Sequence, residues 1–385
     1  TCSVTAVSDQ KSRQVIHGVQ RKHPGAVVAV CGCYAQTDPE AVEALGVDLV
    51  MGTADRMGFL DALEALSPDG GHPVVRVDDA LRRRQYEHLP AGGLEGRTRA
   101  MLKVEDGCVN FCTYCIIPYA RGPIRSLPLE EAACEAKRLA GAGYRELVLT
   151  GIEISSWGHD LKNGQGLIDL VEAVCAAAPE CRVRLGSLEP RTVTEDFCRR
   201  AAATGQVCRH FHLSLQSGCD RTLARMNRKY NTAEFLACVE RLRRYFPGCA
   251  LTADMITGFP GETEADQAAA VAFLEQVGFA AVHVFPYSRR PGTKADAMPE
   301  QLSHAVKSAR AHEAQRVADA CKQRYLVQQV GQTLPVLFET EHDGSWVGHS
   351  DNYCLVRAAG DDLRGLVKNV KISAVSGQML VGDLV

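Results

Sequence analysis

The sequence has no stretch that is long and apolar enough to span a bilayer. The apolar stretch at residues 26–33 is much shorter than the ~20 residues that a membrane-spanning helix needs. The first five residues, Thr-Cys-Ser-Val-Thr, carry neither the basic region nor the apolar core of a secretory signal. We therefore expect a cytoplasmic protein that does not enter a membrane.

A basic excess is also missing, since 43 Lys and Arg against 46 Asp and Glu give a formal net charge of −3. Any contact with nucleic acid must then come from a local basic patch. Cysteine, in contrast, is abundant, with 16 residues. In a cytoplasmic chain this number favours metal binding over a disulfide framework. We expect most of these cysteines to be small buried residues in helices, among them Cys134, Cys175, Cys198, Cys238 and Cys321.

The patterning predicts an α/β protein with several parts. Residues 1–85 alternate short apolar strands with helical stretches, which is typical of a small α/β domain. Charge, Pro and Gly then replace the apolar pattern, so residues 86–98 are read as a linker. Residues 99–328 form the main domain, and residues 329–385 show short alternating runs between turn signals, which predict a small β-barrel or sandwich. We find no repeat beyond the βα period and no low-complexity tract.

The main domain contains six apolar runs, each followed by a helical stretch. Such βα units in series predict a parallel sheet curved into a partial (β/α)6 barrel, with its ligand site at the carboxyl ends of the strands. The runs begin at Met101, Glu146, Arg182, His210, Ala250 and Phe279.

Three cysteines stand close together in the string Cys108-Val-Asn-Phe-Cys112-Thr-Tyr-Cys115. A disulfide can join only two of them, whereas three thiolates can hold a four-iron cluster and leave one iron open for a ligand. A structural zinc site would need a fourth ligand, and Asn110 and Tyr114 are poor candidates. Spacing alone therefore favours an iron–sulfur cluster and leaves zinc, or no metal, as alternatives.

This cysteine string after the first barrel strand resembles the radical S-adenosylmethionine (SAM) superfamily. The resemblance implies that the open iron binds the methionyl group of SAM, whose reductive cleavage gives a radical that abstracts hydrogen. It also implies a set of SAM contacts, in which Tyr114 and the segment from Met255 to Gly258 flank the adenine. Thr150 and Gly151 would approach the methionine amine, and Ser187 and Glu189 would hold polar groups of the ribose or methionine.

The longer strings at residues 106–126 and 285–293 are similar to the methylthiotransferase family, most closely to its tRNA N6-threonylcarbamoyladenosine branch. In that family a second 4Fe-4S cluster carries the sulfur that is transferred, and the motifs around Cys2 and Cys33 resemble two of its three ligand motifs. The third ligand is missing upstream. We expect a shortened N-terminus, although an incomplete second cluster is the other reading. We do not expect Cys31 and Cys33 to be co-ligands.

The resemblance further implies a tRNA anticodon stem-loop as substrate and a flavodoxin or ferredoxin as electron donor, with the enzyme a monomer. The C-terminal part resembles an RNA-binding domain called TRAM, in which we expect base or phosphate contacts from Trp346, His349, Asn352, Tyr353 and Arg357. Four arginines near strand ends are expected to clamp phosphate or the threonyl carboxylate, namely Arg121, Arg125, Arg289 and Arg290.

Three alternatives remain open from the sequence. Two of them keep the same chemistry and direct it at isopentenyladenosine in tRNA or at an aspartate of a ribosomal protein. A zinc-stabilised RNA-binding protein without catalysis is the third.

Overall fold

The structure, a computed structural model, describes residues 1–3, 5–66, 73–89 and 96–385. The chain divides into two compact units. Unit 1 comprises Thr1–His88, Asp106–Arg125 and Ser288–Met298, and unit 2 comprises Leu89–Glu105, Ser126–Tyr287 and Pro299–Val385. Two stretches that the sequence assigned to the barrel domain therefore group with the N-terminal residues. Part of the expected linker, residues 90–95, lies outside the described residues.

Unit 1 contains a small parallel sheet with strand order β1-β2-β3. Its middle strand is fully buried, and the core around it includes Val30, Tyr34 and Val42. Thr5 caps the first helix by accepting a hydrogen bond from the backbone N–H of Ser8. The elements are α1 (Ala6–Lys22), β1 (Ala29–Cys31), α2 (Cys33–Thr37), α3 (Pro39–Glu43), β2 (Leu49–Met51), α4 (Gly58–Glu64), β3 (Val74–Arg76), η1 (Ala80–Arg82), α5 (Ile117–Arg121) and η4 (Lys294–Ala297). The predicted α/β pattern of this segment is confirmed.

Unit 2 is built on two parallel sheets with strand orders β4-β7-β8 and β12-β11-β10-β9. A parallel bridge between Val183 and Val207 links β8 to the residues that precede β10. The strands are β4 (Arg99–Lys103), β7 (Glu146–Thr150), β8 (Arg182–Leu185), β9 (Ser187–Leu188), β10 (His210–Gln216), β11 (Ala250–Thr257) and β12 (Ala281–Pro286), with two-residue strands β5 (Glu105–Asp106) and β6 (Arg125–Ser126) where the chain passes from one unit to the other. The six predicted βα strands are all present, which confirms the partial barrel.

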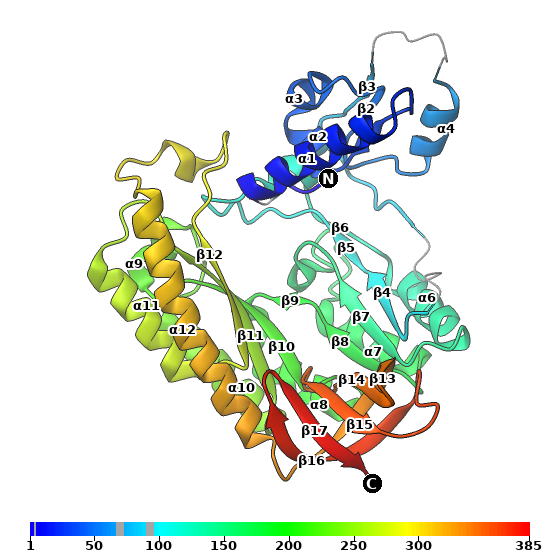
Figure 1. Cartoon of the computed structure of the whole chain (residues 1–385), viewed down its shortest axis with the longest axis vertical. Helices are drawn as coiled ribbons and strands as arrows, with labels where there is room; N and C mark the ends of the chain where they lie inside the picture. Colours follow the sequence, from blue (N-terminus) through cyan, green and yellow to red (C-terminus); the bar gives the residue numbers. More distant parts are fainter. Residues whose placement is uncertain (4, 67–72, 90–95) are drawn as a thin grey trace. The chain divides into compact units, whose positions relative to one another are not determined.

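Helices cover one face of the β10–β12 sheet, as Figure 1 shows for α10, α11 and α12. Phe211 on β10 packs edge-on against Phe246 at the end of α10, so the odd-numbered residues of β10 face the helices. The even-numbered residues of β10 and β11 consequently lie on the other, inner face. The helices of unit 2 are α6 (Leu129–Gly141), η2 (Ile154–Ser156), α7 (Leu167–Ala177), η3 (Pro190–Thr192), α8 (Glu195–Ala203), α9 (Asp220–Arg225), α10 (Thr232–Tyr245), α11 (Glu264–Val277) and α12 (His304–Gln328).

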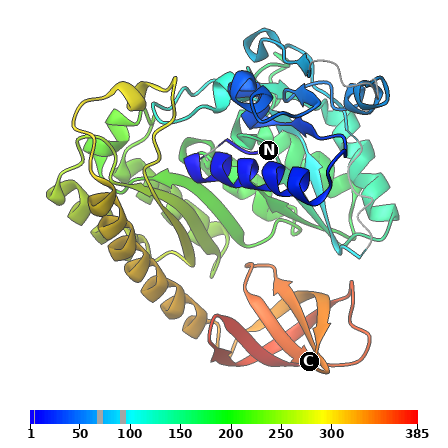
Figure 2. The ribbon, with the colours of Figure 1, turned by 45° about the horizontal axis from the view of Figure 1, so that its top comes forward.

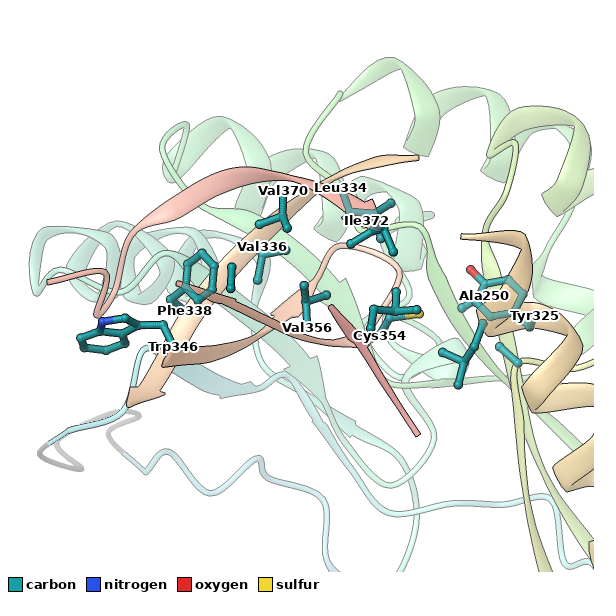
Figure 3. Packing of buried hydrophobic residues seen from close by; sticks show 14 of the residues in the cluster. Ala250, Tyr325, Leu334, Val336, Phe338, Trp346, Cys354, Val356, Val370 and Ile372 are labelled. Atoms are coloured by element: carbon teal, nitrogen blue, oxygen red, sulfur yellow. The ribbon is translucent and has the colours of Figure 1, made fainter. Parts of the chain in front are cut away.

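Helix α12 leads to a closed five-stranded barrel at the C-terminus (Figure 2). Its strand order is β13-β14-β15-β17-β16. The side chains of Val336, Phe338 and Val356 fill its interior (Figure 3). The strands are β13 (Thr333–His342), β14 (Ser345–Ser350), β15 (Leu355–Ala359), β16 (Val367–Ser376) and β17 (Met379–Leu384). Of the two predicted forms, the barrel is correct.

The C-terminal barrel is held to the β7–β8 strands by a buried ion-pair network. Glu146, which has no exposed surface, accepts hydrogen bonds from Arg182 at 2.6 Å and from Arg184 at 2.8 and 3.0 Å. The two guanidinium groups also donate to backbone carbonyls of the C-terminal barrel, including that of Asp351. The Tyr353 ring stacks 4.8 Å from the ring of His210 on β10. This attachment uses side chains from both parts of unit 2.

The same attachment corrects the expected RNA contacts of this barrel. Trp346 is 8% exposed and Asn352 is 1% exposed, so both are part of the packed interior. Tyr353 stacks on both His210 and His349, so the faces of these rings that meet are closed to a base. Tyr353 and Arg357 are the exposed members of the five, and Arg357 lies away from the stacking contacts. Among the described helices, none has the length and apolar character to cross a membrane.

Candidate functional site

The three-cysteine string forms a folded loop at the start of the 106–125 segment of unit 1. The backbone N–H of Cys108 donates to the carbonyl of Gly122 at 2.9 Å, and that of Cys115 donates to the carbonyl of Cys112 at 2.9 Å. Gly107 has a φ of +91°, and a Cβ there would lie 2.0 Å from the Pro123 carbonyl oxygen. Cys112 is buried and the other two cysteines are half-buried. Three sulfur atoms partly shielded from water within one loop fit an iron–sulfur cluster.

Arg121, on the short helix α5 after this loop, connects it to the N-terminal residues of unit 1. Its guanidinium donates to both carboxylate oxygens of Asp106, at 2.7 and 2.8 Å, and it also hydrogen-bonds Cys33. Arg56 and Arg125 lie 3.7 and 3.6 Å from the same carboxylate. Arg121 thereby places a positive charge beside the Cys33 sulfur.

Cys33 and Cys2 lie close together in unit 1. The backbone N–H of Cys33 donates to the carbonyl of Thr1 at 3.3 Å, so the two short segments run side by side. Burial raises the pKa of the Cys33 thiol, the Arg121 charge opposes this rise, and the neighbouring Cys2 adds to it. Cys31 is exposed, whereas Cys33 is half-buried. The structure thus places Cys33 near Cys2 within unit 1.

In unit 2 the end of β7 is shaped by close packing under Gly151. A Cβ at this position would lie 2.7 Å from a carboxylate oxygen of Glu105 and 2.9 Å from its carbonyl oxygen. Glu105 is fully buried and accepts a hydrogen bond from the backbone N–H of Glu153 at 2.8 Å. Sequence reasoning did not single out Glu105, although a carboxylate at the end of the first barrel strand is an unusual core residue. It fixes the backbone of the turn in which Thr150 and Gly151 are expected to meet SAM.

The remaining expected SAM contacts are placed in different ways. The Ser187 hydroxyl lies 2.8 Å from that of Ser214, and Glu189 is buried and pairs with Arg191 at 2.8 Å. Met255 is 1% exposed and, being odd-numbered on β11, its side chain lies on the helix-covered face. The Met255 side chain therefore faces the helices, because neighbouring residues on a strand point to opposite faces.

Gly258 follows β11 in a left-handed conformation with φ of +71°. Its backbone N–H donates to Glu262 at 2.8 Å, and Glu262 in turn accepts from Arg310 at 2.8 Å. Burial raises the pKa of Glu262, while these hydrogen bonds act against the rise. Glu262 is a second loop-fixing acid that sequence reasoning missed. It lies four residues after Gly258, where a capping acid can reach back to a turn.

The four expected clamping arginines differ in accessibility. Arg290 is 6% exposed and donates to Asp9 at 2.6 Å and to Ser3 at 2.7 Å. Arg125 is also buried, and Arg121 pairs with Asp106 as described. The guanidinium groups of Arg290 and Arg125 thus make their hydrogen bonds within unit 1. Arg289 is the most exposed, with 56% of its side chain accessible, and pairs with Asp296.

Comparison with family models matches two parts of the chain. Residues 102–274 match the model described as the radical SAM superfamily. Residues 1–52 match the model described as uncharacterized protein family UPF0004. The two matches correspond to the segments that hold the three-cysteine loop and the Cys2–Cys33 pair.

Similar proteins span almost the whole chain. A Bacillus subtilis protein named threonylcarbamoyladenosine tRNA methylthiotransferase is 38% identical over 97% of this chain and 84% of its own length. The chain belongs to the radical SAM methylthiotransferase family. A Thermotoga maritima member with the same name is 35% identical over 88% of this chain and 77% of its own length. A Fusobacterium nucleatum member named tRNA-2-methylthio-N(6)-dimethylallyladenosine synthase is 33% identical over 94% and 84%.

The fold of this family member is also found among solved structures. The radical SAM methyltransferase TsrM from Kitasatospora setae has a TM-score of 0.58 and 19% identity, and the match covers 77% of this chain and 64% of TsrM. At this identity the likeness supports the fold alone. Membership of the radical SAM family brings with it a 4Fe-4S cluster and SAM.

Proposed function

We propose that the chain methylthiolates N6-threonylcarbamoyladenosine in tRNA, next to the anticodon, to give the 2-methylthio derivative. The observation that carries this proposal is the 38% identity, over 97% of the chain, to a relative with that named activity. The relatives named for the dimethylallyladenosine reaction are somewhat less similar, at 33% for the first of them. The substrate is therefore assigned by similarity, and the chemistry by the cysteine loop.

Cys108, Cys112 and Cys115 would hold the radical SAM cluster. When bound, this cluster supplies the electron that cleaves SAM and so begins hydrogen abstraction. The chain contributes the shielding of the loop and the backbone of Thr150 and Gly151, which Glu105 holds in position. Exclusion of water matters here, because a low-dielectric site strengthens every polar contact to the bound sulfonium.

Cys2 and Cys33 would contribute to a second 4Fe-4S cluster that provides the transferred sulfur. Their proximity and the hydrogen bond of Arg121 to Cys33 support this assignment. A donor bonded to a ligand sulfur stabilises the more negative, reduced form of a cluster. Arg121 is thereby reassigned from a substrate clamp to a partner of the sulfur ligand.

The exposed Arg289 and Arg357 are the expected arginines that remain available to the tRNA backbone, which Arg contacts by paired hydrogen bonds. The electron would come from a small carrier protein such as flavodoxin or ferredoxin. Nucleoside analysis tests the whole proposal. We expect tRNA from cells that lack the full-length protein to lose 2-methylthio-N6-threonylcarbamoyladenosine and to regain it when the gene is restored.

Two outcomes would contradict the proposal. Loss of the 2-methylthio derivative of isopentenyladenosine instead would keep the chemistry and change the substrate, and unchanged tRNA nucleosides would direct attention to a protein substrate. Metal analysis of the anaerobically reconstituted protein provides a separate check. Stoichiometric zinc without labile sulfide would indicate a zinc-stabilised RNA-binding protein.

A further inference from the structure

The inner face of the β10–β12 sheet carries a chain of polar side chains at the level of Ser187. Strand register places His212 beside Ser187 on β9 and beside Thr252 on β11. Asp254 follows two residues later on β11, and His283 on β12 lies directly opposite it. All of these residues lie on the face that α10, α11 and α12 do not cover (Figure 1). It is the face on which Ser187 is expected to contact SAM.

Two short polar contacts join Thr252 to His210 and His212, and a longer one joins His212 to Asp254. Thr252 Oγ1 lies 3.0 Å from His210 Nε2 and 3.0 Å from His212 Nδ1. His212 Nε2 then lies 3.4 Å from a carboxylate oxygen of Asp254. The chain thus runs from the buried His210 to the partly exposed Asp254.

The position of the proton on the His210 ring follows from its burial and its contacts. Burial lowers the pKa of His210 to about 3, so its ring is neutral near pH 7. Its Nδ1 atom has no hydrogen-bond partner among the described residues, and a buried lone pair tolerates this better than a buried N–H. His210 therefore donates through Nε2 to Thr252, whose hydroxyl also lies within hydrogen-bond distance of His212 Nδ1.

The Asp254 carboxylate lies beside the His212 ring on this face. Its side chain is 37% exposed, and the described residues supply no Lys or Arg ion pair to it. His212 and His283 are the titratable groups that face it from the neighbouring strands, and their rings lie 6.5 Å apart. A fixed negative charge on the inner face attracts a cationic ligand and has no advantage for a neutral one.

We infer that Asp254 recognises the positive charge of SAM and that His212 is its positioning residue. SAM is the one cationic small ligand that the family requires, since its sulfur is a sulfonium. Cleavage or methyl transfer converts that sulfur to an uncharged thioether. The carboxylate then favours the reactant over both sulfur-containing products, which promotes their release. The inference rests on membership of the radical SAM family and does not depend on the tRNA substrate.

The test compares SAM with S-adenosylhomocysteine, which has the same adenosyl and amino-acid groups but an uncharged sulfur. Dissociation constants are measured anaerobically by calorimetry on the full chain with its cluster reconstituted. In Asp254→Asn we expect SAM to bind roughly tenfold more weakly, because an opposite charge is lost from a partly solvated site. We expect S-adenosylhomocysteine to change by less than about threefold, since no ion pair is lost.

Three further variants keep the result interpretable. Asp254→Glu retains the charge and should recover most of the preference for SAM. His212→Gln should lower the preference partly, because the carboxylate loses the ring that lies beside it. Asp383→Asn removes an exposed carboxylate from the C-terminal barrel of the same unit and should leave both constants unchanged.

Equal weakening of both ligands in Asp254→Asn, or no weakening of either, would overturn the inference. So would a loss of preference in Asp254→Glu equal to that in Asp254→Asn. Failure of the wild-type protein to bind SAM at all is a distinct result, because it would refute the assignment of the cysteine loop. Melting temperatures of all variants identify any that do not fold.

Discussion

Arg121 donates two hydrogen bonds, of 2.7 and 2.8 Å, to the carboxylate of Asp106, and only 4% of the Asp106 side chain is exposed. Asp106 lies two residues before Cys108, and Arg121 also bonds Cys33. One buried ion pair therefore ties together, within unit 1, the loop of the first cluster and a ligand of the proposed second one.

Asp106→Ala should destabilise the protein strongly. Arg121, Arg125 and Arg56 would lose their shared carboxylate, and an uncompensated buried charge typically costs about 3–5 kcal/mol. Urea unfolding monitored by circular dichroism measures this change. Arg82→Ala, which breaks an exposed ion pair with Asp79, should change the midpoint very little. Equal effects of the two substitutions would contradict the role given to Asp106.

Cys112→Ala should abolish reductive cleavage of SAM. The loop would keep two thiolates, too few to hold the cluster with one open iron. Formation of 5′-deoxyadenosine, quantified by chromatography with dithionite as reductant, provides the measurement. Cys134→Ala removes an exposed cysteine of α6 and should cleave SAM like the wild type. Retained cleavage in Cys112→Ala would count against the radical SAM assignment of the loop.

Cys33→Ala should separate two activities. We expect SAM cleavage to remain and methylthiolation to stop, because Cys33 belongs to the proposed sulfur-donor cluster and not to the SAM loop. Both products are measured in one reaction with the full-length protein. A parallel loss of both activities would argue that the two cysteine sets form a single functional centre.

The folded state should lose stability at acid pH because of Glu146, the carboxylate that helps to attach the C-terminal barrel. Burial acts to raise the pKa of Glu146, but hydrogen bonds and charge attraction with Arg184 outweigh it and hold the pKa at about 2. A pKa below the ordinary value of 4.5 stabilises the folded state above pH 4.5, and this contribution is lost as the pH falls toward 2. It amounts to about 3 kcal/mol.

Urea midpoints measured from pH 7 to pH 2.5 test this dependence. Glu146→Gln should be less stable at pH 7 and should lack the part of the acid slope that Glu146 provides. Glu240→Gln, a change at an exposed position of α10, should retain the wild-type slope. If Glu146→Gln kept the full slope, another carboxylate would be responsible.

Gly151→Ala should weaken SAM binding. The added Cβ would meet Glu105 at 2.7 Å, so the turn must move, at a cost of about 1–3 kcal/mol. Calorimetric titration with SAM measures the loss of affinity. Gly141→Ala on α6 is the matched control, because a Cβ added there meets no described neighbour within 4 Å, and alanine is the better helix former. Wild-type affinity in Gly151→Ala would mean that this turn does not approach the ligand.

The strands and the cysteine chemistry could be predicted from the sequence, because each depends on residues that are close together in the chain. The apolar runs at Glu146, His210 and Ala250 coincide with β7, β10 and β11, since the buried strands of a parallel sheet are rich in apolar residues. The spacing of Cys108, Cys112 and Cys115 lies within one loop. Family resemblance, and with it the expected cofactors, follows from the strings around these cysteines.

The contacts that individual side chains make could not be predicted from the sequence in the same way. Arg290 and Tyr353 belong to residue types that often contact RNA. In the structure, however, Arg290 pairs with Asp9, 281 residues away, and Tyr353 stacks on His210. Whether an arginine or aromatic ring is free or buried depends on which distant segments fold against it. The sequence alone determined the strand order along the chain and the residues able to hold a cluster. Only the tertiary structure decided which polar groups pair with one another inside the protein, because such pairs join segments that are far apart in the chain.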